Sequence, residues 1–234
     1  MSDGERIDSA DPASAAVHRP RATAALAPAA VVVAAAVAFT VAALVGAAER
    51  AGRGGPTLGR YAGTGDTEHP LRLTTGLIVV DIVHAGDGLF EAALAGRGAT
   101  RATIPLLAVR RPYRGTRVVG AAAGEYAVTV RAEGPWMLTL RRPHPARTPF
   151  TFSGAGDGAS ALLALDGTAA IRGRYQGPGP LAVWLFDERG ARVSQLAEAE
   201  GEFVGTVRFR MTPGRHVVFV EAGGEWTVEV LDAD

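Results

Sequence analysis

Apolar and polar side chains alternate with a period of two along most of the chain after residue 48. In the segment 124–132, Tyr126 and Val128 share one face of a predicted strand, and the same alternation resumes at Trp136. Because successive side chains of a strand point to opposite faces, this pattern predicts a β-hairpin. Gly134 occupies its connection, where a tight turn favours a residue that tolerates positive φ.

The same alternation predicts further strands, separated by turn residues every 8–12 positions. They lie at 70–74, 77–84, 89–95, 102–109 and 115–121, and then at 149–154, 160–165, 169–176, 181–187, 192–197 and 203–211. No helical periodicity of 3.6 residues occurs after residue 48. The fold class that we expect is all-β, with two tandem small antiparallel β-sandwich or jelly-roll domains preceded by one transmembrane helix.

The two domains are predicted because the sequence repeats itself. "GEYAVTVRAEGPW" at 124–136 returns as "GRHVVFVEAGGEW" at 214–226, and the offset between matched positions is 91 and later 90 residues, as one deletion would produce. The matched positions are Gly65, Asp66, Gly76, Gly86, Gly88, Gly115, Gly124, Gly134 and Trp136 in the first copy, and Gly156, Asp157, Gly167, Gly177, Gly179, Gly205, Gly214, Gly224 and Trp226 in the second.

Three aromatic residues are predicted to anchor the two cores. Trp136 and Trp226 occupy matched inward positions, and Tyr126 occupies another in the first copy, where the second copy has His216. An aromatic ring at an inward strand position buries about 150–250 Å² of surface. These rings are therefore expected to be structural rather than to stack on a ligand.

The segments "TTGLIVVDI" and "GEYAVTVRAEGPWMLTL" resemble the bacterial pre-peptidase C-terminal (PPC-like) domain family, a group of duplicated extracytoplasmic β-sandwich repeats. Gly124 and Tyr126 match the Gly-x-Tyr of that family, whereas the second copy keeps Gly214 but has His216. The resemblance covers about 61–142 and 150–232. It implies a secreted or surface-attached binding module without catalysis of its own, although no peptidase domain accompanies the repeats.

The front of the chain predicts a membrane anchor. Residues 1–21 lack apolar periodicity and are expected to form a disordered cytoplasmic tail, whereas 22–48 carry no charge. Twenty apolar residues in a helix span about 30 Å, the thickness of a bilayer core. A cleaved signal peptide, with secretion, is the alternative, because small residues follow in "LVGAAERAG". The run is longer than a usual signal peptide needs, which favours an anchor.

Orientation and domain limits follow from where the foldable sequence lies. Arginines flank the apolar run on both sides, so their count does not decide its direction. Nearly all foldable sequence follows the run, so we expect the domains 61–142 and 150–234 to be extracytoplasmic. The segment 49–60 is then a flexible linker, and the Pro-rich segment 143–149 a stiff spacer between two distinct bodies.

Composition excludes several kinds of chemistry. The chain has no Cys, which removes disulfides, Cys-ligated zinc and thiol nucleophiles, and all 24 of its basic residues are Arg, which removes lysine chemistry. Its formal net charge is zero, so no overall field attracts nucleic acid. No catalytic or dinucleotide motif occurs. We therefore expect no enzyme, no catalytic residue, no cofactor, no bound metal and no nucleic-acid partner.

Charge divides unevenly between the copies. Residues 61–142 carry ten Arg and seven acids, a net +3, whereas 150–234 carry seven Arg and twelve acids, a net −5. The arginines that gather in the first copy, within 21 residues, are Arg97, Arg101, Arg110, Arg111, Arg114 and Arg117. A patch of this kind would contact anionic lipid or acidic envelope polymers close to the membrane. Solvated strands, or docking on the acidic second copy, are the plainer interpretations.

A calcium site is the other chemistry to weigh. The repeated Gly-x-Gly-Asp ends at Asp66 and Asp157, and Asp81 and Asp87 lie further along the first copy. Carboxylate oxygens suit Ca²⁺, but an Asp that caps its own turn explains the repeat as well. The second copy has Arg172 and Pro178 where Asp81 and Asp87 stand. A shared cage is therefore not expected.

These observations lead to one expectation and one alternative. We expect a single-pass protein of the cell membrane, held by 22–48, whose extracytoplasmic sandwiches form a non-catalytic binding, interaction or scaffold module. Its partners would be envelope polymers or another envelope protein. A calcium- or carbohydrate-binding surface domain is the alternative, which an exposed Trp184 or Tyr175 beside Asp side chains would favour.

Overall fold

A computed structural model describes residues 55–100 and 102–232, and these residues form an all-β structure. Within those ranges no helix has the length and apolar character needed to cross a bilayer. The predicted tail and membrane helix, 1–48, lie outside the described residues. The all-β prediction is therefore confirmed for the described part of the chain.

Eight strands make up the first half of the described chain. They are β1 (Thr57–Thr64), β2 (Thr67–Leu73), β3 (Gly76–His84), β4 (Phe90–Gly96), β5 (Thr103–Val109), β6 (Tyr113–Ala121), β7 (Gly124–Ala132) and β8 (Pro135–Arg141). Each predicted run of the first copy corresponds to one of these strands. The first strand, β1, has no counterpart in the predictions, because "TLGRYAGT" carries few bulky apolar residues.

The second half contains ten strands, two of them very short. They are β9 (Pro145–Ala146), β10 (Phe150–Ala155), β11 (Gly158–Ala159), β12 (Leu162–Leu165), β13 (Thr168–Gln176), β14 (Pro180–Asp187), β15 (Arg192–Glu200), β16 (Phe203–Arg210), β17 (Gly214–Ala222) and β18 (Glu225–Asp232). The hairpin that the alternation predicts in each copy is wrong: both of its strands form, but β7 and β8 pair with other strands in different sheets, and so do β17 and β18.

The strands assemble into two pairs of sheets with matching strand order. In the first half, sheet 1A has the order β1-β8-β3-β6 and sheet 1B the order β2-β7-β4-β5. In the second half, sheet 2A has the order β10-β18-β13-β16, and sheet 2B has the order β15-β14-β17-β12-β9, with β11 beside β17. Nearly all neighbouring strands are antiparallel; the short β9 pairs in parallel with β12. The strand order thus repeats with the sequence.

Each pair of sheets encloses its own apolar core, so each half is β-sandwich-like. The inward residues of 1A and 1B, including Ile82, Phe90 and Leu94, form one cluster, and those of 2A and 2B form another. Trp136 and Trp226 lie in the respective clusters with 2% and 5% of their surface exposed. Both indole rings therefore lie at the inward positions that the alternation predicts.

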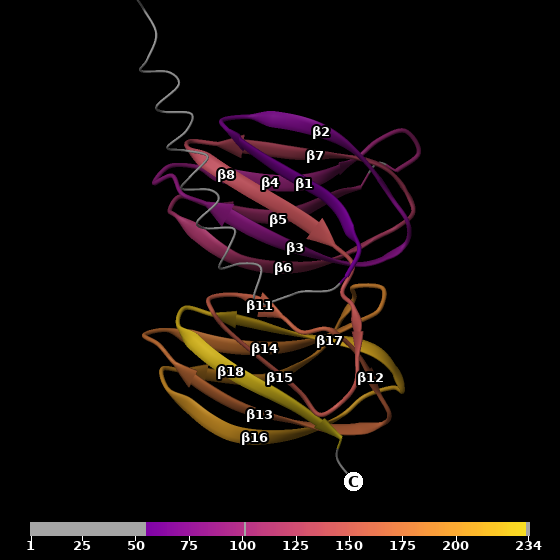
Figure 1. The fold of residues 1–234 in the computed structure, drawn as a ribbon, viewed down its shortest axis with the longest axis vertical. Helices are drawn as coiled ribbons and strands as arrows, with labels where there is room; N and C mark the ends of the chain where they lie inside the picture. Colours follow the sequence, from indigo (N-terminus) through magenta and orange to yellow (C-terminus); the bar gives the residue numbers. More distant parts are fainter. Residues whose placement is uncertain (1–54, 101, 233–234) are drawn as a thin grey trace, which may run out of the picture.

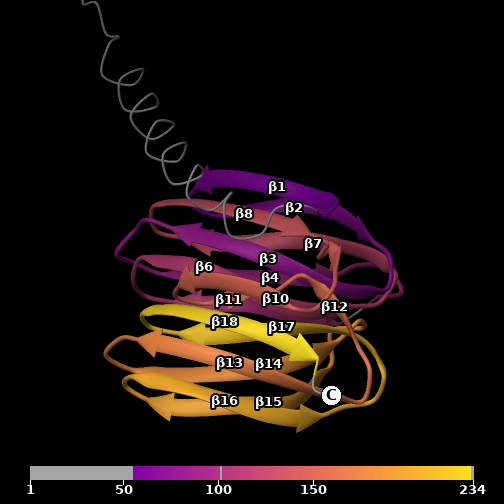
Figure 2. The same cartoon turned by 60° about the horizontal axis from the view of Figure 1, so that its bottom comes forward.

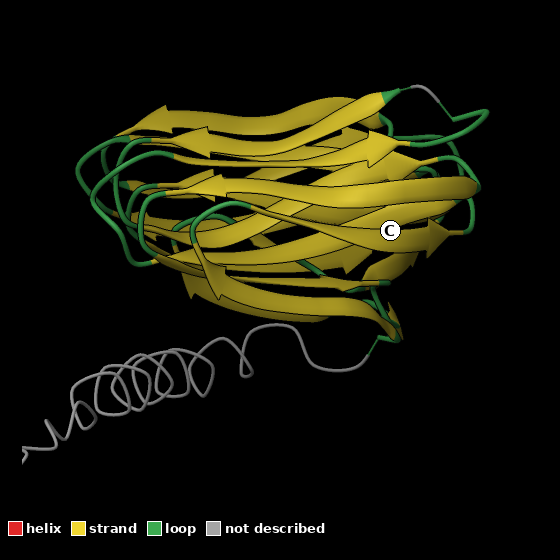
Figure 3. Ribbon diagram, turned by 90° about the horizontal axis from the view of Figure 1, so that it is seen from above, coloured by secondary structure: helices red, strands yellow, loops and turns green. Residues whose placement is uncertain are grey.

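A third apolar cluster joins the two halves. It contains residues of sheet 1A and of sheet 2B that point away from their own cores. Its buried members are Leu77, Val79 and Val118 from 1A and Ala159, Phe186, Val217 and Phe219 from 2B. We call this interface the seam. Figures 1 and 2 show the halves stacked along the long axis, and Figure 3, seen from above, shows strands running across that axis.

The seam corrects the expectation that the halves are distinct bodies held apart by a spacer. Within the predicted spacer 143–149, β9 pairs with β12 and becomes part of sheet 2B. Arg142 precedes it and donates hydrogen bonds to the carbonyl oxygens of Leu77 and Thr74. The predicted linker 49–60 also ends early, because Thr57 begins β1. Prolines here shape a docked connection rather than an extended one.

Candidate functional site

The repeated Gly-Asp pair of the first half joins the β1–β2 connection to the β7–β8 connection, both of which pass from one sheet to the other. The indole N–H of Trp136 donates to the carbonyl oxygen of Gly65 at 2.9 Å, and the backbone N–H of Ala132 donates to Asp66 Oδ1 at 3.0 Å. Gly63 lies opposite Trp136 in the ladder, where a Cβ would touch the ring. Each element of the repeated motif thus has a structural contact.

The second half repeats this arrangement atom for atom. Trp226 donates to the carbonyl oxygen of Gly156 at 2.6 Å, and Ala222 N–H donates to Asp157 Oδ1 at 3.1 Å. Because the same contacts recur in both copies, the acids at 66 and 157 are explained by these hydrogen bonds between connections, without a bound cation. Their carboxylates cap the ends of β7 and β17.

Asp81, another acid proposed for a calcium site, does not contact this motif. Asp81 lies on the outer side of sheet 1A, where Arg141 Nε donates to its Oδ2 at 2.9 Å and Thr116 Oγ1 donates to its Oδ1 at 2.9 Å. Among the described residues, no group of three or more His, Cys, Asp or Glu side chains is arranged to hold a metal ion.

At the seam, Asp157 has a second role that Asp66 lacks. Its Oδ2 accepts a 2.7 Å hydrogen bond from the Tyr113 hydroxyl and forms a 2.9 Å ion pair with Arg117 Nη1. The same Arg117 nitrogen lies 3.3 Å from Glu221 Oε1, and the guanidinium lies over the Tyr113 ring. Strand β6 of the first half is thereby tied to the β10–β11 turn and β17 of the second.

Burial sets the protonation state of the phenol in this network. It raises the pKa of Tyr113 far above the ordinary 10.0, and the neighbouring Asp157 carboxylate raises it further, against a lowering by Arg117. The hydroxyl therefore keeps its proton at physiological pH and donates it to the carboxylate.

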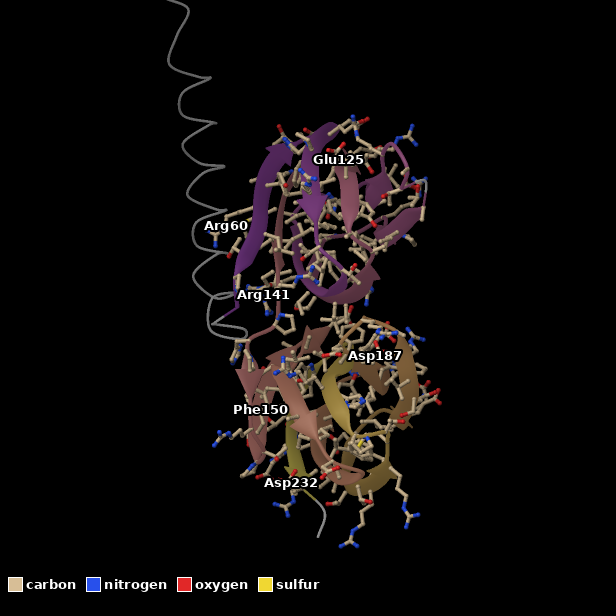
Figure 4. The ribbon with its side chains drawn as sticks, turned by 90° about the vertical axis from the view of Figure 1, so that its right-hand side faces the viewer. Arg60, Glu125, Arg141, Phe150, Asp187 and Asp232 are labelled. Carbon is tan, nitrogen blue, oxygen red and sulfur yellow. The ribbon has the colours of Figure 1, made fainter. Side chains whose placement is uncertain are left out.

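Backbone contacts complete the seam. Thr116 N–H donates to the carbonyl oxygen of Asp157 at 3.0 Å, and Leu77 N–H donates to that of Glu188 at 2.9 Å. Gly120 and Gly190 approach so closely that a Cβ on either would collide with backbone atoms of the other half. Figure 4 labels Arg141 and Asp187 on either side of this interface.

The structure does not bring the six arginines of the first copy into one patch. Arg97 follows β4, whereas Arg110 and Arg111 follow β5; because these strands are antiparallel, the residues lie at opposite ends of sheet 1B. Arg97 pairs with Glu68, and Arg117 lies in the seam. Arg114 lies on β6, and Arg101 lies outside the described residues.

His84 and His69 have structural contacts, whereas the buried Nδ1 atoms of His144 and His216 have no hydrogen-bond partner among the described residues. His84 is buried, stacks on Phe90, and places its Nδ1 and Nε2 at 3.2 and 3.1 Å from the carbonyl oxygens of Arg111 and Glu133. His69 stacks on Tyr61, and His216 takes the inward position of Tyr126.

Neither aromatic residue of the carbohydrate alternative offers an open face. Tyr175 is fully buried in the second core. Trp184 is half-buried, its indole N–H donates to Glu221 Oε2 at 2.8 Å, and the guanidinium of Arg192 lies 4.0 Å from its ring centroid. One face of the Trp184 ring is therefore covered by a guanidinium, and the residue also packs against the seam.

Sequence reasoning missed a different arginine group, on the outer face of sheet 2A. Arg172 and Arg174 on β13, and Arg208 and Arg210 on β16, are all exposed. The spacing Arg-x-Arg in both segments was the available signal, since residues two apart on a strand share a face. Only the pairing of β13 with β16 puts the two segments side by side.

Comparisons with known proteins add no family. No family model matches the chain, and no curated protein matches it. Among solved structures, similarity extends to the PBSX exported protein XepA (9% identity, 76% of this chain and 85% of that one, TM-score 0.28). It also extends to an allantoicase (8%, 76% and 81%, TM-score 0.25) and to a conserved protein of unknown function from Pseudomonas aeruginosa PAO1 (16%, 72% and 82%, TM-score 0.22). Likenesses this distant carry no argument about function.

Proposed function

We propose that the chain is a non-catalytic binding, interaction or scaffold module of the cell envelope. In this proposal two tandem jelly-roll sandwiches, 61–142 and 150–234, are held outside the cell by a membrane helix at 22–48. The strand order of each half supports the jelly-roll assignment, because eight strands in this order form a double Greek key, to which the short β9 and β11 are added in sheet 2B.

One observation carries the non-catalytic assignment: the polar residues that repeat between the copies are used to hold the fold. Asp66 and Asp157 accept backbone N–H groups, and Trp136 and Trp226 donate to backbone carbonyls. In the first half, the buried His84 contacts two more carbonyls. A docked pair of sandwiches of this kind presents fixed surfaces, which suits binding.

The location can be tested by labelling single cysteines, because the native chain has none. Val193 on β15 is 47% exposed, so Val193→Cys offers a reactive thiol on the second half, and Ser2→Cys offers one on the tail. A membrane-impermeant maleimide should label Val193→Cys in intact cells and Ser2→Cys only after lysis. The reverse pattern, or labelling of both only after lysis, would contradict the proposed topology.

The same preparations separate an anchor from a cleaved signal peptide. If 22–48 is an anchor, the Ser2→Cys chain stays full-length in the membrane fraction. Recovery of a shortened, soluble Val193→Cys chain in the medium would instead establish the secreted alternative. Adding Ca²⁺ or EDTA should leave the melting temperature unchanged; a rise with Ca²⁺ would favour the calcium-binding alternative.

A further inference from the structure

The outer face of sheet 2A carries a basic strip. The strip consists of Arg172, Arg174, Arg208 and Arg210, and each side chain is exposed. In the β13–β16 ladder, Arg174 pairs with Val204, Arg172 with Thr206, Ala170 with Arg208 and Thr168 with Arg210. One guanidinium therefore occurs in each of four successive rows on the same face, passing from β13 to β16.

The spacing of these rows defines a line of positive charge. Alternate residues on a strand are about 7 Å apart, so the four rows span about 20 Å. Arg172 and Arg208 are diagonal neighbours across the ladder, which keeps the line continuous. The interval of about 7 Å between successive rows is of the same order as the distance between successive phosphates in an extended phosphodiester chain.

Most of this charge is unpaired within the described part of the chain. Arg172 donates to Glu229 Oε2 at 3.1 Å, whereas the described residues pair Arg174, Arg208 and Arg210 with no acid. Glu225 lies on the same face, opposite Gln176, beyond the end of the strip. Like charges on adjacent strands are unfavourable, and an external anion would relieve their repulsion. The strip is thus a locally unneutralised cation line on a half whose net charge is −5.

Among the remaining acids of the second half, the exposed Asp166 and Glu202 lie beyond the two ends of the strip, two residues before Thr168 and Val204, and others lie off it. Glu198 and Glu200 lie on β15 in the other sheet, and Asp187 and Glu188 lie toward the seam. At physiological ionic strength the Debye length is about 8 Å, so exposed charges at such separations are largely screened. A linear anion that follows the strip would respond chiefly to the four arginines.

From this geometry we propose that the outer face of sheet 2A binds an extended phosphodiester polymer, such as a polyol-phosphate chain of the cell envelope. Guanidinium groups suit phosphate because they donate two parallel hydrogen bonds to its oxygens. Threonine and serine hydroxyls on the same face, at Thr206, Thr227 and Ser153, supply further donors. Phe203 and Phe209 of β16 pack against the core, which disfavours base stacking and hence single-stranded nucleic acid.

This ligand class rests on the proposed envelope function for its biological setting, but its test does not. The full chain, purified in a neutral detergent, is titrated with fluorescent poly(glycerol phosphate). The test variant combines Arg174→Gln, Arg208→Gln and Arg210→Gln. The control variant combines Arg72→Gln, Arg110→Gln and Arg111→Gln, three exposed arginines of the first half, and removes the same charge.

We expect the test variant to bind about tenfold or more weakly and the control variant to bind within about twofold of the native chain. Salt dependence supplies a second measure: the slope of log affinity against log salt should fall by about 2, at roughly 0.7 for each phosphate that the variant no longer neutralises. A variant with Lys at the same three positions should recover part of the affinity, because it restores charge without the guanidinium fork. Unchanged melting temperatures confirm that the variants fold.

Several outcomes would overturn the proposal. Equal losses of affinity in both variants would indicate nonspecific charge attraction. A loss of affinity in the control variant alone would place the anion site on the first half. Tighter binding of polygalacturonate, oligothymidylate or phosphatidylglycerol vesicles than of poly(glycerol phosphate) would reject the phosphodiester polymer. Absence of binding by the native chain would do the same. The cysteine-labelling pattern is independent, so failure here leaves the proposed location standing.

Discussion

Matched sheets of the two halves have similar inner faces and different outer faces. On the outer side of sheet 1A, Val79 pairs with Val118 across β3 and β6 and is buried in the seam. At the matched positions of sheet 2A, Ala170 pairs with Arg208, which is exposed. Likewise Phe219 on sheet 2B is buried in the seam, whereas Thr129 holds its place on sheet 1B.

This difference between the outer faces explains why only the outer faces of sheets 1A and 2B dock on each other in the described part of the chain. The seam joins a 1A-type face to a 2B-type face, so it is heterologous, and a heterologous contact continues indefinitely unless the free faces differ. Here the free 2A face carries arginines and the free 1B face carries polar side chains. A duplicated fold can therefore keep one core pattern while its outer faces diverge according to what covers them.

The largest expected effect tests whether the two cores are equivalent. Trp136→Ala and Trp226→Ala each remove a buried ring and an indole hydrogen bond, so each should cost about 3–5 kcal/mol of unfolding free energy. Urea unfolding measures both, and Trp→Phe variants serve as milder controls if either fails to fold. Costs that differ by more than about 2 kcal/mol would show that the cores contribute unequally.

The next largest loss of unfolding free energy is expected in the seam, where matched positions of the two halves should differ. Phe219→Ala removes a buried ring that packs edge-on against Phe186 at 5.9 Å, at an expected cost of about 3 kcal/mol. The matched control Thr129→Ala lies on a face without such cover and should cost under about 1 kcal/mol. Similar costs for both variants would contradict an energetically important seam.

A smaller effect separates the two capping acids. Asp157→Ala removes a cap, the Tyr113 hydrogen bond and the Arg117 ion pair, so a loss of about 2–3 kcal/mol is expected. Asp66→Ala removes the cap alone and should cost about 1 kcal/mol. Thermal unfolding of both variants, with Asp157→Asn as an isosteric check, decides between them. Equal costs would remove the seam role of Asp157.

The smallest effect is a pH dependence specific to the first half. Because the folded protein holds the pKa of Tyr113 above its ordinary 10.0, the unfolded chain ionises first as pH rises. Stability from this group is therefore complete below about pH 10 and is lost above it. Tyr113→Phe, which copies Phe203 of the second half, should cost about 1 kcal/mol at pH 7 and flatten the alkaline decline. An unchanged alkaline slope would contradict this.

Much of the fold was predictable because strand alternation and repetition are local signals. The period-two pattern located the strands that supply Ile82, Phe90 and both tryptophans to the cores. It did not locate β1, whose small and polar residues gain their order from pairing with β8. The pattern also did not predict β9, since two residues of a Pro-rich segment carry no periodic signal.

The candidate sites were less predictable because charge clustering along a sequence is not clustering in space. Arg97 and Arg110 are close in number but lie at opposite ends of an antiparallel pair. Arg172 and Arg208 are far apart in number but adjacent on one face. Only the ladder register converts sequence distance into spatial distance.

The sequence by itself determined the all-β class, the duplication and the inward positions, because alternation with a period of two and the spacing of glycines are properties of the chain alone. The tertiary structure decided which outer faces are covered, which acids form contacts across the seam and which arginines form the basic strip. Those features depend on pairing and docking between residues tens of positions apart in the sequence. The matched residues Asp66 and Asp157 therefore differ in role: Asp66 accepts a backbone N–H, whereas Asp157 also forms an ion pair across the seam.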